Sequence, residues 1–190
     1  MVETSSLIRR ILAGDREAFK TIVEEYQRLV CHIVFRMVFS PEDREDLCQV
    51  VFIKVYQNLS SFKLESKFSS WIARIAYNAC IDHLKKKKML SLDDFPATGS
   101  YQADLVNRET SPDEYTEKGD LSTRLKTEME KMPVHFRTIL TLYHLEEMSY
   151  AEISEIMQLP EGTVKSYLFR ARGFLKNRLL TKYQKEGLWS

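Results

Sequence analysis

Residues 149–172 read SYAEISEIMQLPEGTVKSYLFRAR, and this stretch decides the fold of the C-terminal third of the chain. It opens with a capping box, in which Ser149 and Glu152 each satisfy an N–H group that a helix start would leave unpaired. Leu159–Gly162 is a tight turn, after which Thr163 can cap a further helix. The apolar residues are spaced so that the two helices pack against each other: Ile153, Ile156, Val164 and Leu168. The stretch therefore predicts a pair of short helices around a tight turn.

Two helices joined in this way form a helix-turn-helix, whose second helix enters the DNA major groove with its first residues on the bases. The second helix supplies several polar and cationic side chains: Thr163, Lys165, Ser166, Tyr167, Arg170 and Arg172, followed by Lys176 and Arg178. The alternative is an ordinary helical hairpin with a solvated basic face. The capping box and turn, together with the basic tail, favour the DNA-binding interpretation.

Charge is distributed unevenly along the chain. The 190 residues hold 28 Lys+Arg and 27 Asp+Glu, a formal charge of +1, and this total by itself argues against nucleic-acid binding. Residues 63–88 and 161–190, however, each hold 7 basic and 2 acidic side chains, whereas residues 89–120 hold 2 and 8. The near-zero total is therefore a cancellation between two basic blocks and one acidic block.

The composition is typical of a globular protein, with 44% hydrophobic and 29% charged residues. His32 and Arg36 interrupt the longest apolar stretch, residues 29–39, so we expect no membrane span. The N-terminus lacks the pattern of a secretory signal. The three cysteines show neither a disulfide framework nor metal-binding spacing. These features favour a reduced, cytoplasmic protein without a cofactor or a metal.

Helical periodicity covers most of the first 90 residues. Gly14 ends a short amphipathic segment, Asp15 is placed to cap the next helix, and Ser40-Pro41 start another that should reach about Leu59. Ser69-Ser70 open a third helix, which extends to residue 88.

Periodicity fails from residue 91 to 120, where prolines, glycines and acids accumulate. Helices are expected again at 121–132, 133–145, 150–157 and 164–183, and no segment has the period of a strand. The sequence therefore predicts an all-α protein with two small helical domains, residues 1–90 and 121–190, joined by a flexible acidic linker over 91–120.

The first basic block combines cations with aromatic rings. On helix 70–88, a polar stripe of Arg74, Asn78, Asp82 and Lys85 lies opposite the apolar face, and the preceding loop places Lys63 and Lys67 between two phenylalanines. Such a mixture suits single-stranded nucleic acid, because bases stack on rings while lysines hold phosphates. The same rings could equally belong to the hydrophobic core.

Helix 42–59 is apolar on nearly all sides, with seven of residues 47–56 being Leu, Val, Phe, Ile or Tyr. A helix that packs on one side needs only one apolar stripe, so a second buried surface is implied. That surface is either further core or the contact site of a partner protein.

Catalytic patterns are weak. The four histidines are scattered, and no glycine-rich phosphate loop is present. Cys80 and His83 share a helix face and could touch a metal with help from elsewhere, but a core cysteine beside a surface histidine is the more common arrangement. We therefore expect no enzyme active site.

The combination resembles a known family. Asp46-Leu47-Cys48-Gln49-Val50-Val51-Phe52 and Phe68-Ser69-Ser70-Trp71-Ile72-Ala73-Arg74-Ile75-Ala76-Tyr77-Asn78 resemble region 2 of extracytoplasmic-function (ECF) sigma factors, group 4 of the sigma-70 family. Ser149–Ile153, Pro160–Ser166 and Arg170–Arg172 resemble region 4. The resemblance covers about residues 5–88 and 120–182.

The resemblance implies a dissociable subunit of bacterial RNA polymerase that directs promoter recognition and initiation. Region 2 would bind the β′ coiled coil of the polymerase through Asp46, Gln49, Phe52, Ile53 and Tyr56. It would hold the −10 element through Lys63, Leu64, Glu65, Ser66, Lys67, Phe68, Trp71, Arg74, Asn78 and Lys85. Region 4 would bind the β flap of the polymerase, and it would read the −35 element through Thr163, Lys165, Ser166, Tyr167, Arg170 and Arg172. Family members are commonly held inactive by an anti-sigma factor, often anchored to the membrane.

Two residues depart from the family pattern. Tyr167 stands where the family usually carries Arg, and Phe169 stands where His is frequent, so an unusual −35 preference is expected. Two alternatives remain. One is a stand-alone helix-turn-helix regulator with an N-terminal sensor or dimerisation domain, and the other is a helical nucleic-acid enzyme, for which no convergent acids can be assembled.

Overall fold

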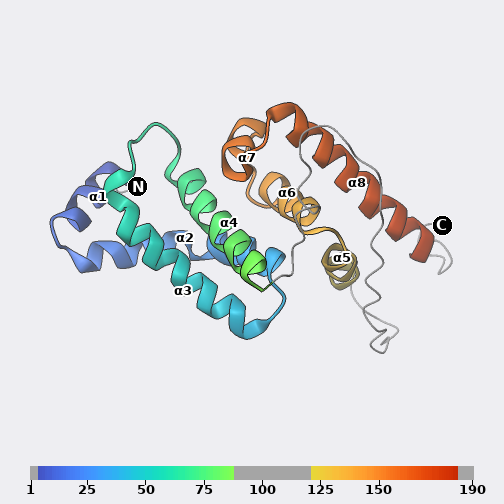
Figure 1. Cartoon of the computed structure of the whole chain (residues 1–190), viewed down its shortest axis with the longest axis horizontal. Coiled ribbons are helices and arrows are strands. Elements are labelled where there is room, and N and C mark those ends of the chain that lie inside the picture. The colour runs from blue at the N-terminus through green and yellow to red at the C-terminus, as the bar shows by residue number, and fades with distance from the viewer. Residues whose placement is uncertain (1–3, 88–120, 184–190) are drawn as a thin grey trace.

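The computed structural model describes residues 4–87 and 121–183, which are helical with short connections (Figure 1). The first described part holds α1 (Thr4–Leu12), α2 (Arg16–Met37), α3 (Pro41–Asn58), a short 3-10 turn (Leu59–Ser61) and α4 (Phe68–Lys86). The second holds α5 (Leu121–Glu130), α6 (Val134–His144), α7 (Tyr150–Met157) and α8 (Glu161–Tyr183). The all-α prediction is confirmed, while the predicted linker at 91–120 lies outside the described residues.

The predicted helix starts of the first part are present. The Asp15 side chain accepts a hydrogen bond from the Ala18 N–H at 3.1 Å and also pairs with Arg10 at 2.7 Å. Ser40 accepts from the Asp43 N–H at 3.3 Å, and Pro41 occupies the first turn of α3. Gly14 has φ +97°, a conformation that favours glycine and separates α1 from α2.

Two predicted helix starts are shifted. Helix α4 begins at Phe68 rather than at Ser69. Helix α8 begins at Glu161 rather than at Val164, and it follows a turn in which Gln158 takes a left-handed conformation. The Pro160 carbonyl accepts from the N–H groups of Thr163 and Val164, so Thr163 lies inside the helix and does not cap it.

The core is continuous across both parts of the chain. Helices α2, α3 and α4 pack on one another in the first part, and α6 packs on α8 in the second. In addition, α7 packs on α4 and α6 packs on α2, so the second part rests on one face of the first. This arrangement places the helix-turn-helix beside the basic loop that precedes α4.

Candidate nucleic-acid interface

The loop before α4 rests on a cluster of aromatic rings. Phe68 stacks on Trp71 with ring centroids 5.4 Å apart, and Phe62 and Tyr26 meet Phe68 edge-on at 5.0 and 5.4 Å. Phe68 and Trp71 are buried, so neither ring is presented to a base. This corrects their predicted role: they support the loop from beneath, which was the core alternative left open by the sequence.

The tip of the loop is open to solvent. Leu64 is 60% exposed and has a positive φ of 59°, an unusual conformation for a residue with a side chain. Lys63, Glu65 and Lys67 are also exposed, and Ser66 is half-buried. The predicted loop contacts are therefore presented together, except for the buried Phe68.

The outer face of α4 continues this surface. Arg74 and Lys85 are exposed and Asn78 is half-buried, in agreement with the predicted polar stripe. Asp82 lies 3.7 Å from Lys54 of α3, which offsets part of its negative charge. A nucleic-acid backbone that approaches this face would therefore meet Arg74 and Lys85, with Asn78 between them.

Helix α8 divides into a buried and an exposed side. Val164, Leu168 and Ala171 are fully packed in the core of the helix-turn-helix. Tyr167 is only 2% exposed and joins this buried side, which corrects its predicted role as a DNA contact. Thr163 is half-buried, whereas the remaining predicted residues of the helix are exposed: Lys165, Ser166, Arg170 and Arg172.

Two cations of α8 lie over aromatic rings of neighbouring helices. The ammonium of Lys165 is 5.4 Å from the centroid of Tyr150, and the guanidinium of Arg172 is 5.1 Å from that of Tyr143. Arg172 also lies 3.2 Å from His144, and burial together with this cation lowers the pKa of His144. Each ring therefore helps to hold its cation in place on the surface of the domain.

Phe169 lies on this surface, and in the sequence it is a departure from the family pattern that is not included among the expected −35 contacts. It is 79% exposed, and its neighbours one turn away on the helix are Lys165, Ser166, Arg172 and Gly173. A Cβ built on Gly173 would meet nothing within 4 Å, so this face of α8 is open. Its helical phase, opposite Val164 and Ala171, was the signal in the sequence that could have identified it.

Helix α3 carries a different kind of surface. Val50, Ile53 and Tyr56 are 39%, 55% and 47% exposed, and we call these three residues the α3 stripe. Asp46 and Gln49 are exposed near it, whereas Phe52 packs against the core. The sequence left open whether α3 has surplus core or a partner surface, and this exposure favours a partner surface.

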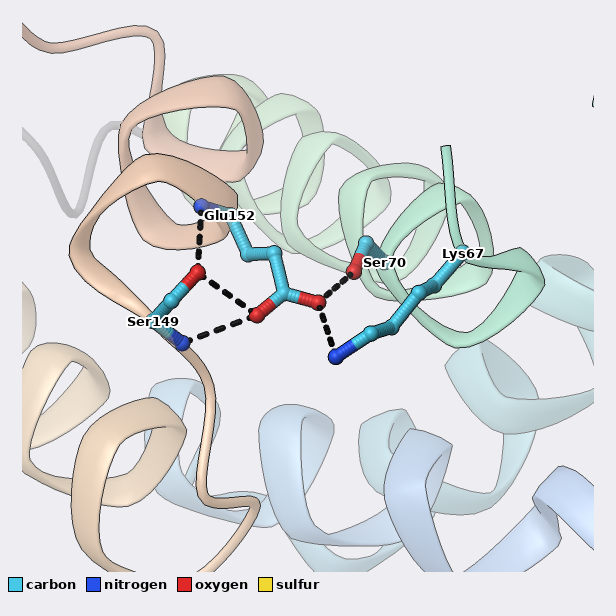
Figure 2. Close-up of polar contacts among 4 residues, drawn as sticks. All are labelled: Lys67, Ser70, Ser149 and Glu152. Atoms are coloured by element: carbon cyan, nitrogen blue, oxygen red, sulfur yellow. Dashed lines mark hydrogen bonds and ion pairs between the residues drawn. The ribbon is translucent and has the colours of Figure 1, made fainter. Parts of the chain in front are cut away.

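Glu152 connects the two parts of the chain (Figure 2). One carboxylate oxygen completes the capping box with the N–H and hydroxyl of Ser149 at 2.8 and 2.7 Å. The other accepts from Lys67 at 3.1 Å and from the Ser70 hydroxyl at 3.0 Å. Burial acts to raise the pKa of Glu152, but the hydrogen bonds from Ser149, Lys67 and Ser70 outweigh it and lower the pKa to about 2. The carboxylate is therefore ionised at neutral pH.

Arg137 makes the second connection. Its guanidinium donates to the carbonyls of Arg36 and Met37 at the C-terminal end of α2, and within its own domain to those of Glu130 and Met132. Burial lowers the pKa of Arg137 to about 10, so it remains charged at pH 7. A cation at this end of α2 is also favoured by the helix dipole.

Within residues 4–87 and 121–183, no group of three or more His, Cys, Asp or Glu side chains is placed to hold a metal ion. The Cys31 and Cys48 sulfurs lie 3.8 Å apart as free thiols, and Cys80 is buried. Within the same residues no helix is long and apolar enough to cross a membrane.

Comparison with known proteins identifies both parts of the chain. The profile of Sigma-70 region 2 matches residues 22–89, and that of Sigma-70 region 4 matches residues 122–175. The ECF RNA polymerase sigma factor SigW of Bacillus subtilis is 33% identical over 176 residues, which cover 90% of this chain and 94% of that protein. The chain belongs to the ECF sigma factors.

Further relatives support this assignment. The ECF RNA polymerase sigma-E factor of Escherichia coli K12 is 33% identical over 177 residues, covering 91% of this sigma factor and 92% of that protein. Among solved structures, the sigma factor RpoE of Bartonella quintana, crystallised with the anti-sigma factor NepR, has a TM-score of 0.65 at 21% identity and covers 86% and 98% of the two chains. CnrH, solved with the cytosolic domain of CnrY, has a TM-score of 0.64 at 17% identity and covers 93% and 96%. These two structures support the fold, and the sequence relatives support the family over the stand-alone regulator.

Proposed function

We propose that this sigma factor binds bacterial RNA polymerase core and directs it to promoters, using two surfaces for the polymerase and two for DNA. The α3 stripe, with Asp46, Gln49 and Phe52 around it, contacts the β′ coiled coil, and the second domain contacts the β flap. The polymerase performs the chemistry, and the sigma factor has no catalytic residue. Because the polymerase works in the cytoplasm, the protein acts there.

The region 2 domain, residues 1–90, holds the melted −10 strand. The exposed tip of its loop provides Lys63, Leu64 and Lys67, and the outer face of α4 provides Arg74 and Asn78. The aromatic cluster beneath, in which Phe68 and Trp71 are buried, supports the loop. The acidic segment 91–120 tethers this domain to the region 4 domain.

The region 4 domain, residues 121–190, reads the −35 duplex through α8. Lys165, Ser166 and Arg170 are exposed on one face, where cations suit phosphates or guanine edges. Phe169 lies among them and suits the C5-methyl group of thymine, an apolar contact used in major-groove readout. The observation that carries the proposal is this exposed face of α8, on a domain that matches Sigma-70 region 4.

The proposal includes control by an anti-sigma factor. RpoE of Bartonella quintana is paired with such a protein in its crystal structure, and the α3 stripe is an exposed apolar surface on which one could bind. A protein covering the stripe would compete directly with the polymerase.

Run-off transcription with purified polymerase core on genomic fragments tests this function. We expect promoter-specific transcripts only when the sigma factor is added. Asn78→Ala should reduce open-complex formation while leaving the affinity for core unchanged. Normal transcription by this variant from a cognate promoter would refute the assigned role of Asn78.

A further inference from the structure

Two of the three cysteines meet inside the region 2 domain. Cys31 of α2 and Cys48 of α3 have their sulfurs 3.8 Å apart, within reach of a weak S–H hydrogen bond. Both side chains are half-buried, whereas Cys80 of α4 is fully buried in the core that Cys48 borders. The pair is 17 residues apart in the sequence, and the packing of α2 on α3 brings the two thiols together.

The geometry of the pair favours a disulfide over a metal site. A disulfide needs the two sulfurs about 1.8 Å closer than their present 3.8 Å, since the S–S bond is ~2.05 Å long. Rotation of the two side chains, with a small shift of the helices, can supply this movement. A metal ion would need further ligands, and in the described parts of the chain no third His, Cys, Asp or Glu joins the pair.

The two thiols lie in different surroundings. Burial, followed by the neighbouring Cys31, raises the pKa of Cys48 to about 12, so the Cys48 thiol is protonated at neutral pH. Because the thiolate is the form that attacks an oxidant, Cys31 is the thiol placed to react first. Burial also raises the pKa of Cys80 to about 12, and this thiol is closed to solvent. Oxidation should therefore be confined to the α2–α3 pair.

The pair lies directly behind the surface that we assign to the polymerase. Cys48 is the sequence neighbour of Gln49, and both belong to the rigid helix that carries the α3 stripe. At the other end of the stripe, Phe19 of α2 meets Tyr56 edge-on, with ring centroids 5.0 Å apart. A change in the packing of α2 on α3 therefore reaches the stripe at two places.

We propose that Cys31 and Cys48 form a peroxide-sensitive thiol pair whose disulfide lowers the affinity of this sigma factor for polymerase core. Drawing Cys48 toward α2 turns α3 about its axis, and with it the stripe. The step from disulfide to affinity rests on the proposed function, which assigns the stripe to the polymerase. Disulfides in the cytoplasm are usually transient and redox-sensing, which fits a reversible bond at this site.

Hydrogen peroxide supplies the oxidising equivalents. The Cys31 thiolate attacks one peroxide oxygen, the O–O bond breaks, and the displaced hydroxide takes up the thiol proton as water, which leaves a sulfenic acid on Cys31. The Cys48 sulfur then attacks the Cys31 sulfur. The S–S bond forms, the S–O bond breaks, and the Cys48 proton leaves with the hydroxyl group as a second water. The two thiols lose two electrons, which the peroxide accepts.

Peptide mapping after peroxide treatment tests for the bond. The reduced protein is treated with hydrogen peroxide, its remaining thiols are blocked with N-ethylmaleimide, and it is digested with trypsin. We expect peptide 29–36, which holds Cys31, joined to peptide 45–54, which holds Cys48. Cys80 should be recovered as a blocked thiol in peptide 75–85. Absence of the joined peptide, or equal joining of Cys80, would overturn the thiol pair.

Titration with labelled core measures the consequence. Oxidised wild-type protein should bind core about tenfold more weakly than reduced protein, as expected when an interface anchor is displaced, and dithiothreitol should restore the affinity. Cys31→Ser cannot form the bond and should keep its affinity in peroxide. Cys80→Ala is the matched control, because it retains the pair and should lose affinity as the wild type does.

Equal affinity of oxidised and reduced wild-type protein would overturn the switch, and so would an equal loss in the Cys31→Ser variant. Reversal by dithiothreitol separates the disulfide from oxidation of methionine. If reduced protein fails to bind core while the joined peptide forms, the proposed function is wrong and the disulfide stands. If reduced protein binds core and the joined peptide does not form, the thiol pair is wrong and the sigma-factor function stands.

Discussion

The two surfaces that we propose bind DNA place aromatic rings and cations in opposite ways. In region 2, Phe68 and Trp71 are buried beneath the loop, and Lys67 at its surface is paired with an acid. In region 4, Phe169 projects into solvent among Lys165 and Arg172. Region 4 therefore presents an exposed ring among its cations, whereas the rings of region 2 lie beneath its loop and one of the loop lysines is paired with an acid.

Removing the charge of the open surface should have the largest effect. Lys165→Glu with Arg170→Glu replaces two cations that we propose bind DNA with repelling anions, and each good base contact contributes ~1–3 kcal/mol. We expect affinity for a −35 duplex to fall by at least ~100-fold, measured by anisotropy. Arg16→Glu with Lys20→Glu makes the same charge change on α2 and should have little effect. Unchanged promoter binding by the α8 variant would refute the role of that helix.

The polymerase-binding surface allows a comparison within region 2. Ile53 and Leu12 are both 55% exposed, but only Ile53 belongs to the α3 stripe. Ile53→Ser should weaken binding to core about tenfold, because an apolar anchor at an interface centre contributes ~1–2 kcal/mol. Leu12→Ser should leave this affinity unchanged. Equal losses for the two variants, measured by titration with labelled core, would argue against the stripe.

The exposed aromatic ring of α8 should contribute less than its cations. Phe169→Ala is expected to lower affinity for the −35 duplex about fivefold, as for the loss of one apolar contact with a thymine methyl group. Deoxyuridine in place of thymidine removes the same methyl group from the DNA. Wild-type protein should lose affinity on this replacement, and the Ala variant should not. Equal sensitivity of both proteins would show that Phe169 contacts something else.

Much of this comparison could be predicted from the sequence. The capping residues Asp15, Ser40 and Ser149 act locally, so their roles follow from neighbouring residues, and all three caps are present. Helical periodicity identified the buried residues Ile153 and Ile156 of α7 for the same reason.

What the sequence could not show depends on contacts between distant segments. Glu152 was recognised as a capping residue from its neighbours in the sequence. Its bond to Ser70, however, joins positions 82 residues apart, and its bond to Lys67 joins the same two segments. The buried positions of Trp71 and Tyr167 have the same origin. A ring beside lysines suits both a core and a stacking surface, and only the packing of neighbouring helices distinguishes them.

The smallest expected effect concerns pH. The pKa of Glu152 is lowered to about 2 in the folded protein, below its usual value of 4.5. Its ionised form therefore stabilises the fold at pH above 4.5, and this contribution is lost as the pH falls toward 2. Glu152→Gln should lower the free energy of unfolding by ~1 kcal/mol near neutral pH. The difference from wild type should shrink in acid when followed by calorimetry.

Glu155→Gln, on the exposed side of α7, is the control and should show no such pH-dependent difference from wild type. A difference for Glu152→Gln that stays constant with pH would contradict the assigned role of its carboxylate.

A zero-length cross-link between Lys67 and Glu152 tests most directly whether the region 4 domain packs on the region 2 domain as the structure shows. A water-soluble carbodiimide joins an amine to a carboxylate that it already contacts, and these two groups are 3.1 Å apart. In the free protein, mass spectrometry should find tryptic peptide 64–74 joined through Lys67 to peptide 138–165 through Glu152. Failure to form this link in the free protein would contradict the packing of the two domains.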